Sequence, residues 1–325
     1  MKFTVAHNDQ AQLRFSLKKA LNQALQNISQ NEPQLIANIV YHIPKAVNSL
    51  KLSFPIVSGG IFVHQQPQVI CKNFPTSSPQ SVEIGDLLLL RSEIRRGTGK
   101  STSALLLQAK KIDTVPISGL NANQHHLYSS WPSFEYIRST AKLNGKRRHI
   151  TGMDLYNAGK YLLIFKNSAH AICVPTCFLC ECNNLCLSVL SAQPQFPKLG
   201  HYYCFLKELV DFILGDAGKP YNSPPPKWKR NWDRVINDLI DITAKRASVF
   251  IRKASGGTMP QRGQYLCFVT ERFPYNGSNF KISAKELPDE LTKDGPPLVP
   301  LEKINEEDSD GVGISVIEFV VSNDK

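Results

Sequence analysis

Two apolar segments of the sequence each carry, at one end, polar residues that are suited to chemistry. Asp86 stands directly before the run Leu87–Leu90, and Gln108-Ala109-Lys110 directly follows the next apolar run. Side chains alternate along a strand, so Gln108 and Lys110 share one face, and a hairpin between the two runs would bring Asp86 beside them. An ionised aspartate and an ionised lysine at the ends of two apolar strands cost free energy unless they are paired, solvated or bound to a metal ion. The pattern therefore allows either a reactive site or a structural ion pair.

The hydrophobic pattern predicts the elements that would position these residues. Apolar residues at three- and four-residue spacing predict a helix over 10–29, and Asn31 is a suitable N-cap for a second helix. The second helix carries Glu32 in its first turn and should end near His42 or Ile43, because Pro44 follows. Runs typical of strands cover 54–57, 61–64, 69–71, 82–90, 104–110, 161–165 and 314–321, and further helices are expected over 203–214 and 232–247.

This order of elements predicts an α/β fold, or an α+β variant of it, with helices on both faces of the sheet. The length of 325 residues allows one large domain or two modest ones. We expect a domain over 1–200 and a C-terminal α+β extension over 201–325, and one continuous domain is the alternative. No apolar run is long enough to span a membrane, and the N-terminus is too polar for a signal peptide, so we expect a cytoplasmic location.

The two segments resemble the restriction-endonuclease-like, or PD-(D/E)xK, superfamily of nucleases. In its Mrr-type branch glutamine replaces the second acid, which gives the pattern D…QxK, and Asp86 with Gln108-Ala109-Lys110 matches this variant. Gly85 stands where the signature has proline. The resemblance covers about residues 30–170 and implies a restriction-endonuclease-like mixed central sheet flanked by helices. Glu32 lies where such nucleases often carry an additional carboxylate.

By this resemblance the chain is expected to cleave DNA with Mg²⁺ or Mn²⁺, as a bacterial antiviral or restriction-type effector. Asp86, the side chain of Gln108 and the carbonyl group of Ala109 would bind the metal ion. Lys110 would hold the attacking water or stabilise the charge that develops on the phosphoryl group. Glu32 would add a second carboxylate, and its alternative role is to complement the dipole of its helix. Residues 201–325 would then serve recognition, assembly or control.

The net charge of +11 is concentrated in one part of the chain. Between residues 87 and 160, basic residues exceed acidic residues by eight. A focused positive field suits a polyanion, so nucleic acid is the expected partner, with DNA favoured over RNA. The candidate phosphate contacts are Arg95, Arg96, Lys146, Arg147 and Arg148. Their alternative interpretation is that of solvated loop charges.

Two further motifs are weaker candidates for a site. The segment Gly97–Ser101 is similar to a phosphate-binding P-loop, but Ile94 occupies the position of its first glycine, and a strand should follow where the motif needs a helix. Five cysteines fall between 173 and 186, of which only Cys177 and Cys180 have a zinc-knuckle spacing. A structural zinc ion there is disfavoured against buried thiols.

The aromatic stretch between these segments has a structural and a functional interpretation. Tyr128, Trp131, Phe134 and Tyr136 could stack on bases, but core packing on the sheet is the favoured interpretation. The pair His125 and His126 could act as a general base or contact the substrate, but a surface position is the favoured interpretation.

Two functions of other classes compete with a nuclease. One is a non-catalytic nucleic-acid-binding protein, and the other is an assembly or interaction protein of a defence system in which Asp86 and Lys110 form a structural ion pair. Metal-dependent cleavage would separate the nuclease from both, and salt-sensitive nucleic-acid binding would separate the first two from the last. A regulatory protein partner and a homo-oligomer are further expectations, and no membrane partner is expected.

Overall fold

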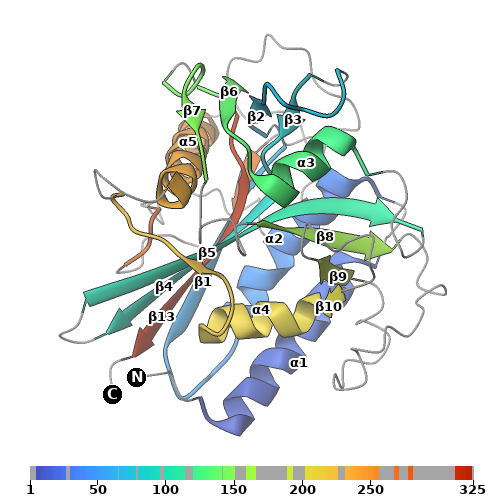
Figure 1. Ribbon diagram of the computed structural model, residues 1–325. Coiled ribbons are helices and arrows are strands. Elements are labelled where there is room, and N and C mark those ends of the chain that lie inside the picture. The colour runs from blue at the N-terminus through green and yellow to red at the C-terminus, as the bar shows by residue number, and fades with distance from the viewer. Residues whose placement is uncertain are drawn as a thin grey trace.

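The structure is a computed structural model that describes residues 5–26, 30–64, 66–77, 80–95, 99–113, 120–140, 142–150, 159–165, 189–192, 202–225, 231–255, 267–270, 277–280 and 312–323. The described chain is an α/β protein with a mixed central sheet, helices, and a small antiparallel sheet (Figure 1). The strands of the central sheet are β1 (Ile56–Val63), β4 (Leu87–Arg95), β5 (Gly99–Ile112), β8 (Gly159–Phe165), β9 (Val189–Ala192), β10 (Tyr202–Cys204), β11 (Lys219–Pro220), β12 (Cys267–Thr270) and β13 (Ser315–Asn323).

The central sheet runs in the order β10–β9–β8–β5–β4–β13–β1–β12, and β11 pairs with β5 beside this path. Two of its pairs are parallel, β13 with β4 and β5 with β8, and the other pairs are antiparallel. The β4–β5 hairpin, which the two apolar runs predict, is present, with Leu87 opposite Leu107. The leucines at 87–90 and 105–107 are fully enclosed, as expected for strands that are covered on both faces.

Five helices pack on this sheet in the described part of the chain: α1 (His7–Ala24), α2 (Glu32–Asn48), α3 (Ala122–Ser130), α4 (Phe205–Leu214) and α5 (Asn231–Ser255). Helix α2 contacts β1 and β13, with α1 and α4 on its side of the sheet, while α5 and the small sheet lie on the other side (Figure 1). The small sheet has the order β3 (Val82–Glu83), β2 (Gln68–Ile70), β6 (Phe134–Arg138) and β7 (Arg147–Arg148). Among the described helices, none combines the length and apolarity that crossing a membrane requires.

Helix α2 begins as expected and ends later than expected. Asn31 is its N-cap, since the side-chain oxygen accepts a hydrogen bond of 2.9 Å from the Gln34 N–H. The prediction that Pro44 ends the helix is wrong, because the helix continues to Asn48. Proline has no N–H for the Val40 carbonyl four residues earlier, and the buried Thr270 hydroxyl donates to that carbonyl instead, at 3.0 Å. A tertiary hydrogen bond thus compensates for the proline.

The same contact explains the glycines in β1. The segment Ser58-Gly59-Gly60 was expected to separate two strands, but β1 runs through it without a break. A Cβ atom at Gly60 would lie 2.6 Å from the Thr270 hydroxyl oxygen and 2.7 Å from the Val40 carbonyl oxygen. Gly60 therefore lets α2 approach the sheet closely, which is a role in packing rather than in a turn.

The C-terminal part of the chain completes the central sheet. Strand β13 lies between β4 and β1 and is in parallel register with β4 from Ser315 opposite Leu87 to Asn323 opposite Arg95. Strand β12, also from the segment 201–325, forms the edge beyond β1. Strands from both sides of residue 200 thus share one sheet, and the division into a domain over 1–200 and an extension over 201–325 stays a prediction.

Candidate functional site

The β4–β5 hairpin brings the predicted acid and the glutamine into direct contact. Asp86 lies one residue before β4, and its backbone N–H donates to the Leu107 carbonyl at 2.9 Å. Its carboxylate accepts hydrogen bonds from the Gln108 side-chain amide and from the Ala109 backbone N–H, the latter at 2.7 Å. For Ala109 it is therefore the N–H that contacts Asp86, and a metal contact through its carbonyl group stays a prediction.

The start of α2 brings Glu32 to the same place. Lys110 forms an ion pair of 3.7 Å with Glu32, and both side chains are about one third exposed. The structural alternative of an Asp86–Lys110 ion pair is thus not the pair that forms, although the positive charge of Lys110 does act on Asp86 by lowering its pKa. An accessible lysine next to a carboxylate can donate to a water molecule or to a phosphate oxygen.

The electrostatics of Asp86 are unfavourable for its charged form. Burial raises its pKa well above the ordinary value, and the neighbouring Glu83 and Glu32 carboxylates raise it further. Lys110 and the Ala109 N–H oppose this shift without cancelling it. A carboxylate that the fold keeps at such cost is a candidate for a functional group, because a bound cation would remove the penalty.

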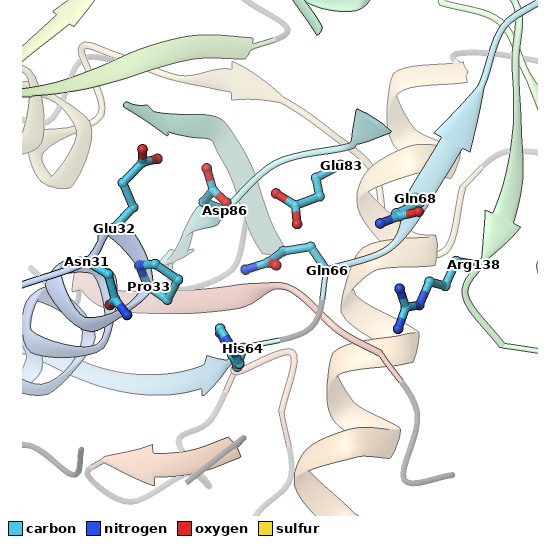
Figure 2. A pocket seen from close by; sticks show the side chains of 9 residues that line it. All are labelled: Asn31, Glu32, Pro33, His64, Gln66, Gln68, Glu83, Asp86 and Arg138. Atoms are coloured by element: carbon cyan, nitrogen blue, oxygen red, sulfur yellow. The ribbon is translucent and has the colours of Figure 1, made fainter. Parts of the chain in front are cut away.

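Asp86, Glu83 and Glu32 line a cavity of about 360 Å³, whereas Gln108 and Lys110 are not among its lining residues. Figure 2 shows the Glu32, Asp86 and Glu83 carboxylates along one wall and Gln66 beside them, with Asn31 and Pro33 at one end and Gln68 and Arg138 at the other. The start of α2, the loop after β1 and the small sheet all contribute to the lining, which also includes His64. The cavity thus lies between the small sheet and the end of the β4–β5 hairpin that carries Asp86.

Comparison of the chain with models of protein families, with curated proteins and with solved structures finds no match. What the site can do therefore has to be inferred from its own residues.

The donor set fits a hard divalent cation that also uses ligands from substrate or water. Within the described residues, no three His, Cys, Asp or Glu side chains are grouped closely enough to hold a metal ion by themselves. However, the amide of Gln108 that contacts Asp86 has its oxygen buried without a hydrogen-bond partner. An unsatisfied buried oxygen next to a carboxylate is the type of ligand that Mg²⁺ binds, and Mg²⁺ commonly uses only one or two carboxylates.

Sequence reasoning missed the other lining residues of the cavity. Glu83 lies three positions before Asp86 and influences its pKa more than Glu32 does, but nothing in the pattern separates it from an ordinary strand residue. Gln66, Gln68 and Arg138 come from the loop after β1 and from β2 and β6, which pair only in the folded chain. The basic residues between 87 and 160 include Arg138, and this was the one signal that could have found it.

The expected phosphate contacts are not all near this cavity. Arg95 ends β4, nine residues from Asp86, which is about 30 Å along a strand, and it pairs with Glu93. Arg147 and Arg148 form β7, where they pair with Glu135 at 3.0 Å and with Asp238 at 2.7 Å. Lys146 is exposed in the turn before them. Arg96 lies outside the described residues.

The remaining candidates fall outside the cavity. Tyr128, Trp131, Phe134 and Tyr136 are buried, which confirms their role in the core. They come from α3, its C-cap and β6. His125 and His126 lie on α3 and do not line the cavity. Cys177 and Cys180 lie outside the described residues, so the zinc alternative stays a prediction.

Proposed function

We propose that this protein is a metal-dependent nuclease that hydrolyses phosphodiester bonds of DNA at the cavity around Asp86. The observation that carries the proposal is that Gln108 bonds to Asp86 and Lys110 pairs with Glu32, and that these two carboxylates line one partly exposed cavity. This is the arrangement implied by the resemblance to restriction-endonuclease-like enzymes with the D…QxK pattern.

In the proposed reaction Asp86 and the oxygen of Gln108 would hold the cation, and Glu32 would be a second carboxylate for the ion or its water. The bound Mg²⁺ or Mn²⁺ would supply positive charge to the phosphoryl oxygens. Because Gln108 is neutral, the site provides fewer anionic ligands than one with a second acid, so we expect the cation to bind weakly and to depend on substrate phosphate.

Lys110 acts on the water or on the phosphoryl group. In hydrolysis the water oxygen forms a bond to phosphorus, the bond from phosphorus to the leaving oxygen breaks, and the leaving oxygen takes up a proton. The Lys110 ammonium forms an ion pair with Glu32 at 3.7 Å, which positions it. In the proposed step it donates to the attacking water or to the oxygen on which negative charge develops. The proton that the water loses passes to a carboxylate of the cavity or to solvent.

The substrate and cellular role follow from charge and resemblance. The excess of basic residues between 87 and 160 supports a polyanionic substrate, and the resemblance favours DNA over RNA and a role as a bacterial defence effector in the cytoplasm. The same proposal includes a regulatory protein partner and a homo-oligomer, because the activity of defence effectors is commonly regulated by binding or assembly. One observation favours a non-catalytic DNA-binding protein instead, namely that no cluster of three acidic or thiol or imidazole ligands is present among the described residues.

A plasmid-nicking assay tests the proposal. Purified wild type, Lys110→Ala and Lys19→Ala are each incubated with supercoiled plasmid and Mg²⁺, Mn²⁺ or EDTA. Lys19 is an exposed residue of α1 that does not line the cavity, so its replacement removes the same charge without changing the site. We expect nicking that requires the metal ion, that Lys19→Ala retains, and that Lys110→Ala reduces at least about a hundredfold.

Equal nicking by wild type and Lys110→Ala would place the activity elsewhere or in a contaminant. Absence of metal-dependent nicking together with tight, salt-sensitive DNA binding would favour the non-catalytic alternative.

A further inference from the structure

Besides its carboxylates, the cavity beside Asp86 is lined by a set of amides, called the amide wall below, that the proposed cleavage does not use. Gln66, Gln68 and Asn31 contribute side-chain amides to it, and Arg138 contributes a guanidinium group (Figure 2). Whereas the carboxylate wall is negatively charged, these groups are neutral or positive. One cavity therefore offers cation ligands together with hydrogen-bond donors and acceptors.

The amides of this wall are anchored at one end and available at the other. The Gln68 oxygen accepts from the Ser81 hydroxyl at 2.9 Å, which leaves its amino group without a partner among the described residues. The Asn31 oxygen caps α2 by accepting from the Gln34 N–H, which fixes the orientation of its amide. Gln66, only 9% exposed, makes a long contact of 3.5 Å from its amino group to the Val63 carbonyl, and its oxygen is left for a ligand.

Fixed amides of this kind recognise the hydrogen-bonding edge of a nucleobase, since they present both donors and acceptors. The Pro33 ring in the same lining supplies an apolar surface for the face of a base. Arg138 stands opposite Gln68 in the pairing of β2 with β6, where it can contact a neighbouring phosphate.

The size of the site is compatible with a ligand as small as a single base. The cavity of about 360 Å³ is at the small end of the range for small-molecule sites, about 300–1,000 Å³. It is bounded at one end by the start of α2 and at the other by the small sheet. In a duplex the Watson–Crick edge is occupied and the base is stacked, so only an unpaired nucleotide can bring that edge to the amides.

We infer that this amide wall binds an unpaired nucleobase next to the phosphate that is cut, so that the substrate is single-stranded DNA or an unpaired position within a duplex. The inference rests on the proposed function for the cleavage step, but base binding itself does not require cleavage. This makes the two separable by experiment.

The test compares one fluorescently labelled single-stranded oligonucleotide of mixed sequence with the same strand annealed to its complement. Binding is measured by anisotropy in Ca²⁺ and cleavage in Mg²⁺, for wild type, Gln66→Leu, Gln68→Leu and the control Gln12→Leu, whose side chain is exposed on α1. Two separate variants of the wall guard against a folding defect in either one, and thermal unfolding of each verifies the fold.

We expect wild type and Gln12→Leu to bind and cut the single strand at least about tenfold better than the duplex. Each wall variant should lose about tenfold in single-strand binding, the scale of one lost base contact, with little change for the duplex. Equal or better action on the duplex by wild type would overturn the inference and leave the nuclease proposal standing. Preferential single-strand binding that depends on Gln66 or Gln68, without any cleavage, would support base binding and contradict the nuclease proposal.

Discussion

Replacement of Asp86 by asparagine should stabilise the fold in the absence of metal ions and at the same time abolish the proposed cleavage. Asparagine keeps an oxygen that can accept from Gln108 and from the Ala109 N–H. It removes the charge that burial and the neighbouring Glu83 and Glu32 carboxylates disfavour. Each unit by which a folded-state pKa is raised corresponds to about 1.4 kcal/mol. The gain in the free energy of unfolding should therefore be on the order of 1 kcal/mol or more.

The sign of the pH dependence follows from the direction of the shift. The pKa of Asp86 is raised on folding, so between its ordinary value and the raised value the folded state binds more protons than the unfolded state. The stability of the wild type should therefore fall as the pH rises through that interval, and the full penalty is present above it. The asparagine variant lacks this component, so the difference between the two proteins should grow from acidic pH towards neutral pH.

Urea unfolding in EDTA, followed by circular dichroism at several pH values, measures this difference. Glu135→Gln is the matched control, because its carboxylate pairs with the exposed Arg147 on the surface, where such pairs contribute about 0–1 kcal/mol. Addition of Mg²⁺ should then stabilise the wild type and not Asp86→Asn, since a ligand of the folded state raises stability by mass action. If Asp86→Asn is less stable than wild type at neutral pH in EDTA, the assignment of a net penalty to this carboxylate is refuted.

Two further predictions concern the framework of the site. Thr270→Val removes the hydroxyl that donates to the Val40 carbonyl, four residues before Pro44. A buried carbonyl without a partner should lower the free energy of unfolding, measured in urea, by about 1–3 kcal/mol. No change would mean that the proline is tolerated for another reason. Arg148→Met breaks the partly buried ion pair with Asp238 that links β7 to α5. The variant should lose about 1–3 kcal/mol and recover part of it when combined with Asp238→Asn, whereas strictly additive effects would contradict a direct pair.

The parts of the site that lie close together in sequence could be predicted. The β4–β5 hairpin follows from two apolar runs with one polar connection, and its register places Asp86 beside Gln108 and Ala109. Asn31 also could be predicted as the N-cap of α2, since capping depends on residues within one turn. Both features arise from local preferences and do not require knowledge of distant contacts.

The features that the sequence did not reveal depend on contacts between distant segments. Continuation of α2 past Pro44 requires the hydroxyl of Thr270, more than two hundred positions away. The amide wall requires that β2 pair with β6, which brings Gln68 next to Arg138. Glycine in a strand commonly indicates a bulge or a bend, whereas Gly60 marks the close approach of a helix. In each case tertiary packing overrides the local preference.

The position of β13 determines when the central sheet can be completed during synthesis. Strand β4, next to Asp86, has β13 as one of its two neighbours, and β13 spans residues 315–323. During synthesis β4 leaves the ribosome long before this neighbour exists, and at about 5–20 residues per second the interval lasts on the order of ten seconds or more. In that time the hairpin next to Asp86 has an open edge, and the sheet that supports the cavity is incomplete. We therefore expect a nascent chain to lack the proposed activity until β13 has inserted between β4 and β1.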